Sequence, residues 1–358
     1  MDSKKEKLDS SVTIMDVAKH AGVGVTTVSR VINNKDEVNE ETRKKVLQSI
    51  SELNYSPKAV AQLLGRGGTM HEEKKASYTV GLIAHESMKS DPYFVHILDG
   101  VERELSSNGI SCIFSQIRED IVSRESSFNE YNLSKLLMED KLDCIIGVSI
   151  RNIETVELFK NTKLPLVFID TEDFEDDIDY IKADNLAGAK KAVSYLASLG
   201  HKRIAYIRGE LKSWFFNDLE EGYIQALKQY KLAFDPQLIV CGEDNPEAGY
   251  SLAIKLLELA EPPTAIFTDD ITAIGVINAV KEKGMEIPRD ISVVGFDDID
   301  AAAYIYPTLT TVQVPKYEIG VAAARKAVEH LKNNSFLSPV KTLLATKLVI
   351  RGSTGNLK

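Results

Sequence analysis

The side chains best suited to recognising another molecule lie near the N-terminus, within VTIMDVAKHAGVGVTTVSRVINN at residues 12–33. One face of a short predicted helix carries small hydrogen-bonding groups and one guanidinium, namely Thr26, Thr27, Ser29 and Arg30. Such a set can enter a major groove and form hydrogen bonds with base edges. The helical periodicity alone would fit any small bundle of amphipathic helices equally well.

Three short helices are expected to hold this face in place. The first has apolar residues at i, i+3, i+4 and i+7, which are Ile14, Val17, Ala18 and Ala21. Thr13 with Asp16 resembles a capping box, and Gly22 supplies the left-handed residue that a tight turn needs. The second helix turns its apolar side chains inward, namely Val28, Val31 and Ile32. The third begins at Asn39, whose amide suits an N-cap.

A fourth short helix is predicted from Ser56 and Pro57, which suit a cap and a first turn, to Gly65. Isolated helices shorter than about 12–15 residues are marginal in water. This helix should therefore form only when something packs on it. The polar, glycine-containing stretch 67–75 is typical of a loose linker.

Charge is distributed unevenly along the chain. The 358 residues carry a net charge of −10, which by itself argues against a nucleic-acid-binding protein. Residues 1–66, however, contain 11 Lys and Arg against 9 Asp and Glu, which leaves 32 against 44 for the rest. The N-terminal part can approach DNA while the remainder is repelled. The length, with 44% hydrophobic residues, predicts two or three domains.

Other features exclude several classes of protein. Cys112, Cys144 and Cys241 lie in apolar runs, which predicts core thiols in a reducing cytosol. The N-terminus has no apolar signal core, and no run approaches the ~18 apolar residues of a membrane span, so a cytoplasmic protein is expected. We find no nucleophile with its base, metal cluster or phosphate loop, and expect no enzyme, metal site or cofactor.

From Tyr78 onward, short apolar runs alternate with helical patterns, as in βαβ units with a parallel sheet. The first series has expected strands at 80–84, 112–114, 144–148 and 167–169, and helices at 94–107 and 132–139. The second has strands at 204–207, 238–240, 265–267 and 293–296, and helices at 187–199, 222–229, 248–259 and 273–283. Two doubly wound parallel-sheet subdomains follow. Their ligands bind outside the carboxyl ends of the strands, so a cleft between the halves is expected.

Both parts of the chain resemble one family. DVAKHAGV, TVSRVIN, ETRKKV and LNYSPKAVAQ follow one another as in the DNA-binding headpiece of the lactose/galactose repressor (LacI/GalR) family. HKRIAYIRG, PTAIFTDD, ISVVGFDDID and PTLTTVQVP resemble the family's regulatory domain, itself similar to periplasmic sugar-binding proteins. The resemblance implies an all-α helix-turn-helix headpiece and an α/β periplasmic-binding-protein-like body. The expected parts are a disordered tail (1–11), the DNA-binding domain (12–57), a hinge helix with linker (58–77) and an effector-binding and dimerisation domain (78–358).

The function that this resemblance implies is that of a ligand-responsive repressor of carbohydrate-use genes. It would bind a pseudo-palindromic operator as a homodimer, since the C-terminal RGSTGNLK lacks a leucine-rich tetramerisation helix. The alternative is a cytoplasmic sugar-binding protein or sensor whose contact with DNA is secondary.

The resemblance also assigns DNA contacts by position. Residues facing bases would be Val25, Thr26 and Arg30. Residues holding phosphates would be Thr13, Thr27, Ser29, Asn33, Asn39, Thr42 and Tyr55. Hinge contacts would come from Lys58, Ala61 and Leu64, with Leu64 as an apolar wedge in the minor groove. Gly24 departs from the family's usual serine at the start of the recognition helix.

The effector contacts are expected at strand ends and loops. They are Tyr93, Asp170, Trp214, Asn217, Asp244, Asp269 and Asp297. Tyr93 and Trp214 would stack on the ligand, whereas Phe94 would be core. The carboxylates, and Asn245 beside Asp244, could bind ligand hydroxyls or simply cap helices. Leu219 stands where the family commonly has arginine, which disfavours a carboxylate or phosphate and favours a neutral sugar. The acidic run 172–177 is interpreted as a solvated loop.

Overall fold

The computed structural model describes residues 13–32, 38–53, 78–85, 92–117, 142–171, 177–209, 214–332 and 338–357. The chain forms two compact units, Met1–Lys75 and Ala76–Lys358. The predicted tail, hinge helix, linker and 132–139 helix lie outside the described residues, as does most of the acidic run.

The N-terminal unit contains α1 (Ile14–Ala21), α2 (Val25–Ile32) and α3 (Glu40–Glu52). The capping box is confirmed, because the Thr13 hydroxyl accepts a hydrogen bond from the Asp16 amide at 3.3 Å and Asp16 Oδ2 accepts one from the Thr13 amide at 2.8 Å. Gly22 ends α1 in the left-handed region at φ 66°. Asn39 Oδ1 accepts from the Thr42 amide at 2.8 Å, so it caps α3 as predicted.

A small apolar core joins the three helices. Val17, Val28 and Val46, one from each helix, have no exposed surface. Partly buried residues pack around them, namely Ile14, Ala21, Val23, Val38, Ile50 and Leu53. This core fixes which side of α2 faces outward.

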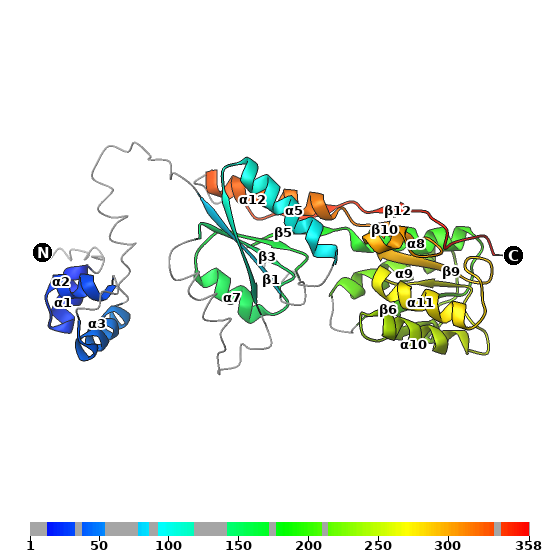
Figure 1. The fold of residues 1–358 in the computed structure, drawn as a ribbon, viewed down its shortest axis with the longest axis horizontal. Coiled ribbons are helices and arrows are strands. Elements are labelled where there is room, and N and C mark those ends of the chain that lie inside the picture. Colours follow the sequence, from blue (N-terminus) through cyan, green and yellow to red (C-terminus); the bar gives the residue numbers. More distant parts are fainter. Residues whose placement is uncertain are drawn as a thin grey trace, which may run out of the picture. The chain divides into compact units, whose positions relative to one another are not determined.

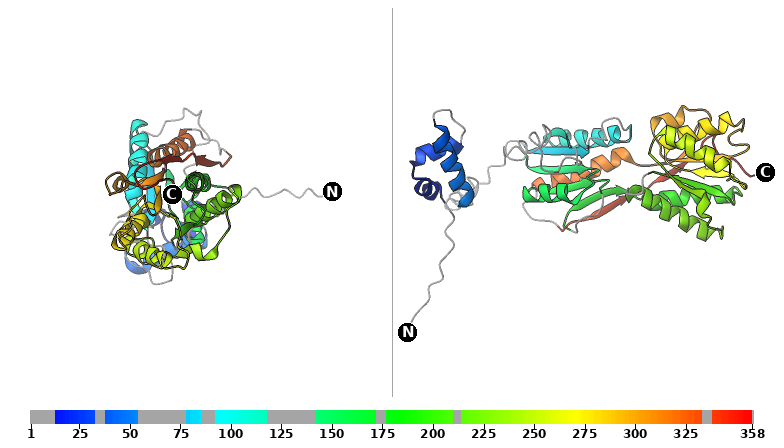
Figure 2. Two further views of the ribbon diagram at one scale, coloured as in Figure 1. Left: turned by 90° about the vertical axis from the view of Figure 1, so that its right-hand side faces the viewer. Right: turned by 90° about the horizontal axis from the view of Figure 1, so that it is seen from below.

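The larger unit consists of two lobes, each a twisted sheet with helices on both faces (Figures 1 and 2). The first lobe contains β1 (Thr79–His85), α5 (Pro92–Ser107), β2 (Ser111–Ile117), β3 (Cys144–Val148), α7 (Ile153–Asn161), β4 (Leu166–Ile169), β5 (Asp179–Ala183), α12 (Lys316–Lys332) and β11 (Lys341–Leu344). Its strand order is β11-β5-β4-β3-β1-β2, and every neighbouring pair is parallel.

The second lobe has the strand order β12-β10-β9-β8-β6-β7 and is parallel except for β12 against β10. It contains α8 (Asn185–Ser198), β6 (Ile204–Arg208), α9 (Trp214–Gln229), β7 (Ile239–Cys241), α10 (Pro246–Leu257), β8 (Ala265–Phe267), α11 (Asp270–Glu282), β9 (Ser292–Asp297), β10 (Thr310–Gln313) and β12 (Lys347–Val349). Short 3-10 helices cover Pro236–Leu238 and Asp300–Ala303. Both predicted doubly wound subdomains are thus confirmed.

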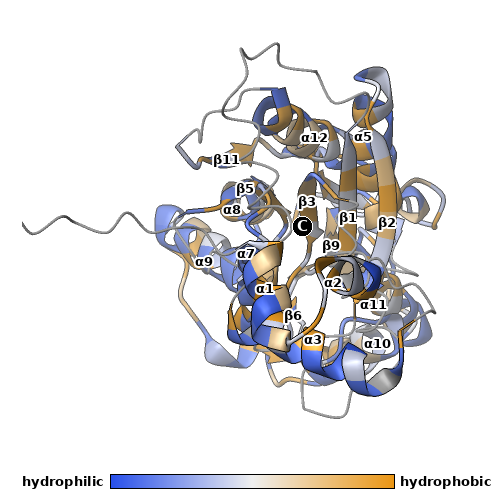
Figure 3. Ribbon diagram, turned by 90° about the vertical axis from the view of Figure 1, so that its left-hand side faces the viewer, coloured by the Kyte–Doolittle hydropathy of each residue, from blue (hydrophilic) through white to orange (hydrophobic). Residues whose placement is uncertain are grey.

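Alternate residues of the strands face different helix layers, as the period of two requires. In β6, Tyr206 belongs to the core beneath α8 and α9, whereas Ile207 belongs to the core with α10 and α11. The central strands are largely apolar, as their colouring in Figure 3 shows for β1 and β3, and β3 is buried along its whole length. Sheets covered on both faces demand such runs, which is why the sequence indicated them.

The chain passes between the lobes after β5, after β10 and after β11. As a result α12, late in the sequence, lies against α5 in the first lobe (Figure 1). Gly100 and Gly320 allow this close crossing, because a Cβ on either would collide with a backbone carbonyl of the other helix, that of Tyr317 or Ile97.

The prediction of three core thiols is wrong for Cys241. Cys144 is buried and Cys112 half-buried, but Cys241 is exposed because it ends the short edge strand β7. Within the described ranges, no helix combines the length and apolar character that crossing a membrane requires.

Candidate functional site

The outward side of α2 presents the side chains predicted to face bases. Val25, Thr26 and Arg30 are exposed, while Val28 and Val31 anchor the opposite side in the core. Val25 is 42% exposed, so its methyl groups are available for an apolar contact with a partner. The predicted base contacts remain predictions.

Two predicted phosphate ligands also have structural roles. The Thr13 hydroxyl lies 2.6 Å from Asp16 Oδ2 within the capping box, and Asn39 caps α3. Thr27 is half-buried, as is Thr42. The predicted contacts of Asn33, Tyr55, Lys58, Ala61 and Leu64, and of the Ser29 side chain, lie outside the described residues.

In the first lobe, the structure brings Tyr93 and Asp170 together. The Tyr93 hydroxyl donates to Asp170 Oδ2 at 2.6 Å, from the first turn of α5 to the end of β4. Asp170 is 7% exposed and has φ 43°. Burial raises the pKa of its carboxyl to about 6, although the Tyr93 hydrogen bond, the positive charge of Lys182 and the Ala183 backbone amide act in the opposite direction. Phe94 is buried, as predicted for a core residue.

In the second lobe, Trp214 begins α9 instead of lying in a loop. The helix starts eight residues before the predicted boundary because Phe216, Leu219 and Tyr223 are buried at helical spacing beneath it. In the sequence, the neighbouring aromatic and acidic residues made this helical spacing of apolar residues hard to recognise. The Trp214 indole is half-buried, and Lys182 Nζ from β5 lies 4.5 Å from its ring centroid.

Two lysines that the sequence analysis did not single out therefore link the lobes. Lys182 spans from β5 to Trp214, while Lys316 Nζ lies 5.6 Å from the Tyr93 ring centroid. Lys316 is 7% exposed and donates to the backbone carbonyls of Asp297 and Asp298, the latter at 3.1 Å. The sequence could have indicated both lysines, because each stands beside apolar residues. Lysine is rarely buried without partners, so such a lysine is expected to contact other groups.

The remaining predicted carboxylates differ in their surroundings. Asp269 is 4% exposed and caps α11 through the Thr272 amide at 2.8 Å, and burial raises the pKa of its carboxyl. Asp297 ends β9 with φ 105°. Asp244 is exposed, and Asn245 caps α10 through the Ala248 amide at 2.8 Å. The capping interpretation is thus confirmed for Asp269 and Asn245.

Asn217 contacts an arginine that the sequence analysis did not consider. Arg208, the last residue of β6, donates from Nη2 to Asn217 Oδ1 at 3.0 Å and forms an ion pair with Glu220 through Nη1. Leu219, at the position where arginine was expected from the resemblance, has no exposed surface and belongs to the core. A guanidinium is therefore present beside α9, supplied by a strand.

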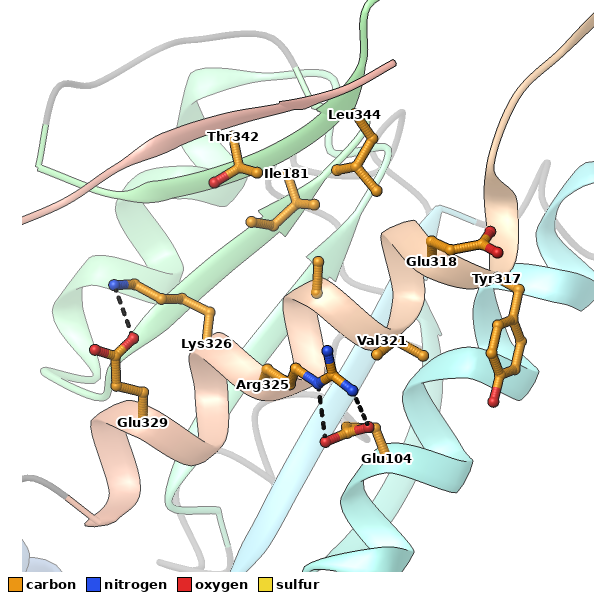
Figure 4. A pocket seen from close by; sticks show the side chains of 11 residues that line it. Glu104, Ile181, Tyr317, Glu318, Val321, Arg325, Lys326, Glu329, Thr342 and Leu344 are labelled. Atoms are coloured by element: carbon orange, nitrogen blue, oxygen red, sulfur yellow. Dashed lines mark hydrogen bonds and ion pairs between the residues drawn. The ribbon is translucent and has the colours of Figure 1, made fainter. Parts of the chain in front are cut away.

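A groove of about 650 Å³ lies elsewhere in the first lobe, between α5, α12, β5 and β11 (Figure 4). Two ion pairs lie in it, Arg325 Nε with Glu104 at 3.2 Å and Lys326 with Glu329 at 3.1 Å. It contains none of the predicted effector residues. The better candidate for a ligand site is the strand-end cluster, in which side chains from both lobes lie close together, namely Tyr93, Asp170, Lys182, Trp214 and Lys316.

Comparisons with known proteins identify the class. Residues 13–58 match the model of bacterial regulatory proteins of the lacI family, and residues 193–354 match a periplasmic binding protein-like domain. The chain is 35% identical to the HTH-type transcriptional repressor PurR of Pasteurella multocida (strain Pm70), covering 90% of this chain and 93% of the relative. It is 32% identical to the repressor CytR of Escherichia coli (strain K12), covering 98% of each.

Solved structures agree with this assignment. A complex of the transcriptional regulator CelR with cellobiose is 27% identical with a TM-score of 0.70, covering 96% of this chain and 99% of that one. The Lac repressor bound to ONPG in its repressed state is 26% identical with a TM-score of 0.67, covering 96% and 100%. The chain belongs to the lacI family of bacterial transcriptional regulators, and the relatives PurR and CytR are transcriptional repressors.

Proposed function

We propose that this regulator binds a pseudo-palindromic operator as a homodimer and represses carbohydrate-use genes in response to a small neutral, hydroxyl-rich effector. The exposed face of α2, held by a core on its other side, is the observation that carries the DNA-binding part. Two such helices in a dimer would meet half-sites one turn apart, about 34–36 Å. Operator binding would place the protein in the cytoplasm, and the proposal assigns it no catalysed reaction.

The effector part rests on the strand-end cluster. Tyr93 and Trp214 provide one aromatic ring from each lobe, and Asp170 provides a buried carboxyl between strand and loop. Structural relatives support a sugar, since one contains cellobiose and another, a LacI family regulator from Enterococcus faecium, contains ribose. A sugar offers both an apolar face for stacking and hydroxyls for the carboxylates.

Ligand binding can change the affinity for DNA by changing how the two lobes are spaced. Lys182 and Lys316 already connect residues of one lobe to the other, so a ligand that alters these contacts shifts how the lobes sit. A ligand favouring one arrangement must be bound less well by the other, and the coupling is reciprocal. Effector and operator affinities should therefore change by the same factor.

A gel-shift assay on DNA from upstream of the gene, against random DNA of equal length, tests the DNA-binding part. Arg30→Ala should lose most of the discrimination, whereas Lys45→Ala should retain it. Lys45 is the matched control because it is an exposed cation of the same unit that pairs with Glu41 along α3. Equal affinity of the unaltered protein for both DNAs would refute operator recognition.

Thermal-shift screening against sugars tests the effector part, since a ligand at 100 times its dissociation constant stabilises by about 2.7 kcal/mol. The alternative, a sugar sensor with secondary DNA contact, predicts a sugar-dependent shift without preference for any DNA sequence. The two assays together separate these functions.

A further inference from the structure

Two buried polar atoms stand out in the larger unit. Among the described residues, Asp170 Oδ1 and Arg208 Nε are the buried side-chain atoms without a hydrogen-bond partner. Folded proteins pair nearly all such atoms with protein groups, ordered water or a ligand. One belongs to each lobe, and each lies at the carboxyl end of a parallel strand, where such sheets bind ligands.

Arg208 is held firmly in place. Its side chain is 8% exposed, and its two terminal nitrogens bind Glu220 and Asn217 on α9. Tyr206, two residues earlier on the same face of β6, donates its hydroxyl to the carbonyl of Phe216 at 3.2 Å. The guanidinium therefore lies beneath the first turns of α9, which begins at Trp214. Glu220 balances its charge, and Nε–H remains as one unused donor.

Asp170 presents the complementary group. The Tyr93 hydroxyl donates to Oδ2, and the Ala183 backbone amide also favours the charged carboxyl, but Oδ1 has no hydrogen bond of normal geometry on a side chain that is 7% exposed. Tyr93 in turn lies under Lys316, which binds backbone carbonyls at the end of β9. Asp170 is thus bonded to Tyr93, which Lys316 covers, whereas Arg208 binds Asn217 and Glu220 on the helix that begins at Trp214.

We infer that Asp170 Oδ1 and Arg208 Nε are the two polar anchors of the effector, an acceptor in the first lobe and a donor in the second. Arg208 is then a specificity-determining residue of the site that the proposed function requires. The ligand carries an O–H or N–H group for Asp170 and a lone pair for Arg208. Because Glu220 already neutralises the guanidinium, that lone pair belongs to a neutral oxygen, such as a sugar hydroxyl, and not to a carboxylate or phosphate.

The first test screens full-length protein by thermal shift against neutral monosaccharides and disaccharides, including ribose and cellobiose, beside their aldonic acids, ribonate and cellobionate. At least one neutral sugar should raise the melting temperature, and its aldonate should not. A panel in which no neutral sugar acts, or in which only acids act, overturns the inference.

The second test measures calorimetric affinity for the sugar found in that screen. Arg208→Lys keeps a cation beside Glu220 but removes Nε–H, and it should bind the sugar about tenfold more weakly, the size of one lost hydrogen bond. Arg203→Lys is the matched control, the same change just before β6, where Arg203 pairs with Asp235 at 3.1 Å. It should stay within about twofold. Equal affinity of Arg208→Lys and the control refutes the role of Arg208.

A third measurement does not depend on whether Arg208→Lys folds. Single-deoxy analogues of the sugar, bound to unaltered protein, should identify two hydroxyls whose removal each costs about tenfold in affinity. If no single hydroxyl matters, Asp170 Oδ1 and Arg208 Nε are satisfied by water only. Operator binding on the same samples separates the outcomes, since intact operator binding with failed sugar tests refutes this inference alone.

Discussion

Replacing Asp170 by asparagine should stabilise the protein at neutral pH and progressively less as the pH falls. The carboxyl is 7% exposed, and burial raises its pKa from the ordinary 3.8 to about 6. Above pH 6 the folded chain holds a buried carboxylate, which the isosteric amide avoids while it can still accept from Tyr93. At about 1.36 kcal/mol per pKa unit, burial of the charge costs about 3 kcal/mol at pH 7.5.

The pH dependence follows from the same two pKa values. A carboxyl whose folded pKa is raised contributes most favourably below its unfolded pKa, and this contribution is lost as the pH rises through the folded pKa. At pH 5 the cost is only about 1.6 kcal/mol, so the advantage of Asp170→Asn should shrink by about 1.4 kcal/mol between pH 7.5 and pH 5. Asp270, whose pKa burial raises to about 8, titrates in both proteins and cancels in the difference.

Urea unfolding followed by fluorescence can measure this difference, because Trp214 is the only tryptophan and lies at the site. Asp99→Asn is the matched control. Its carboxylate is 44% exposed in a surface pair with Arg103, so its removal should change the free energy of unfolding by under about 1 kcal/mol at either pH. A pH-independent effect of Asp170→Asn, or a loss of stability at pH 7.5, would refute the assignment of a buried, destabilising carboxylate.

Three further results are expected. Thr13→Ala should destabilise the headpiece transition in calorimetry of the intact protein by about 1 kcal/mol through loss of the capping box, and Thr13→Ser should restore it. Arg30→Ala should cost about 1–3 kcal/mol on the operator and relax preference at one base pair per half-site, whereas a phosphate-only role would give uniform losses and a shallower salt dependence. Trp214→Ala should abolish the effector response but retain operator binding without ligand; unchanged effector affinity would assign Trp214 to packing instead.

The features that sequence predicted well are those determined by neighbours along the chain. The capping box of Thr13 and Asp16 spans one helical turn, and β3 and β8 are uninterrupted apolar runs. The predicted strand boundaries 144–148 and 265–267 match those of the structure. In such segments, local propensity and burial favour the same conformation, so the secondary structure can be predicted without knowing the fold.

The features that sequence reasoning missed depend on distant partners. Strand β11 pairs with β5, about 160 residues earlier, and is too polar and short to be recognised alone. Asp270 resembles any acidic residue in a first helical turn, yet it is buried and accepts hydrogen bonds from Thr311 and Ile299. Lys182 and Lys316 connect the two lobes only because the chain crosses from one lobe to the other and back.

The proposed neutrality of the effector does not depend on Leu219. Leu219 suggested a neutral ligand because a guanidinium was expected there and was absent, yet Arg208 supplies a guanidinium from β6. This cation is already paired with Glu220, and Lys316 is bound by two backbone carbonyls. An anionic ligand would have to compete with these partners for the buried Arg208 and Lys316, whereas a neutral hydroxyl can use the one remaining Nε–H without breaking them. The proposed neutrality of the ligand therefore rests on the partners of Arg208 and Lys316, and not on the absence of an arginine at position 219.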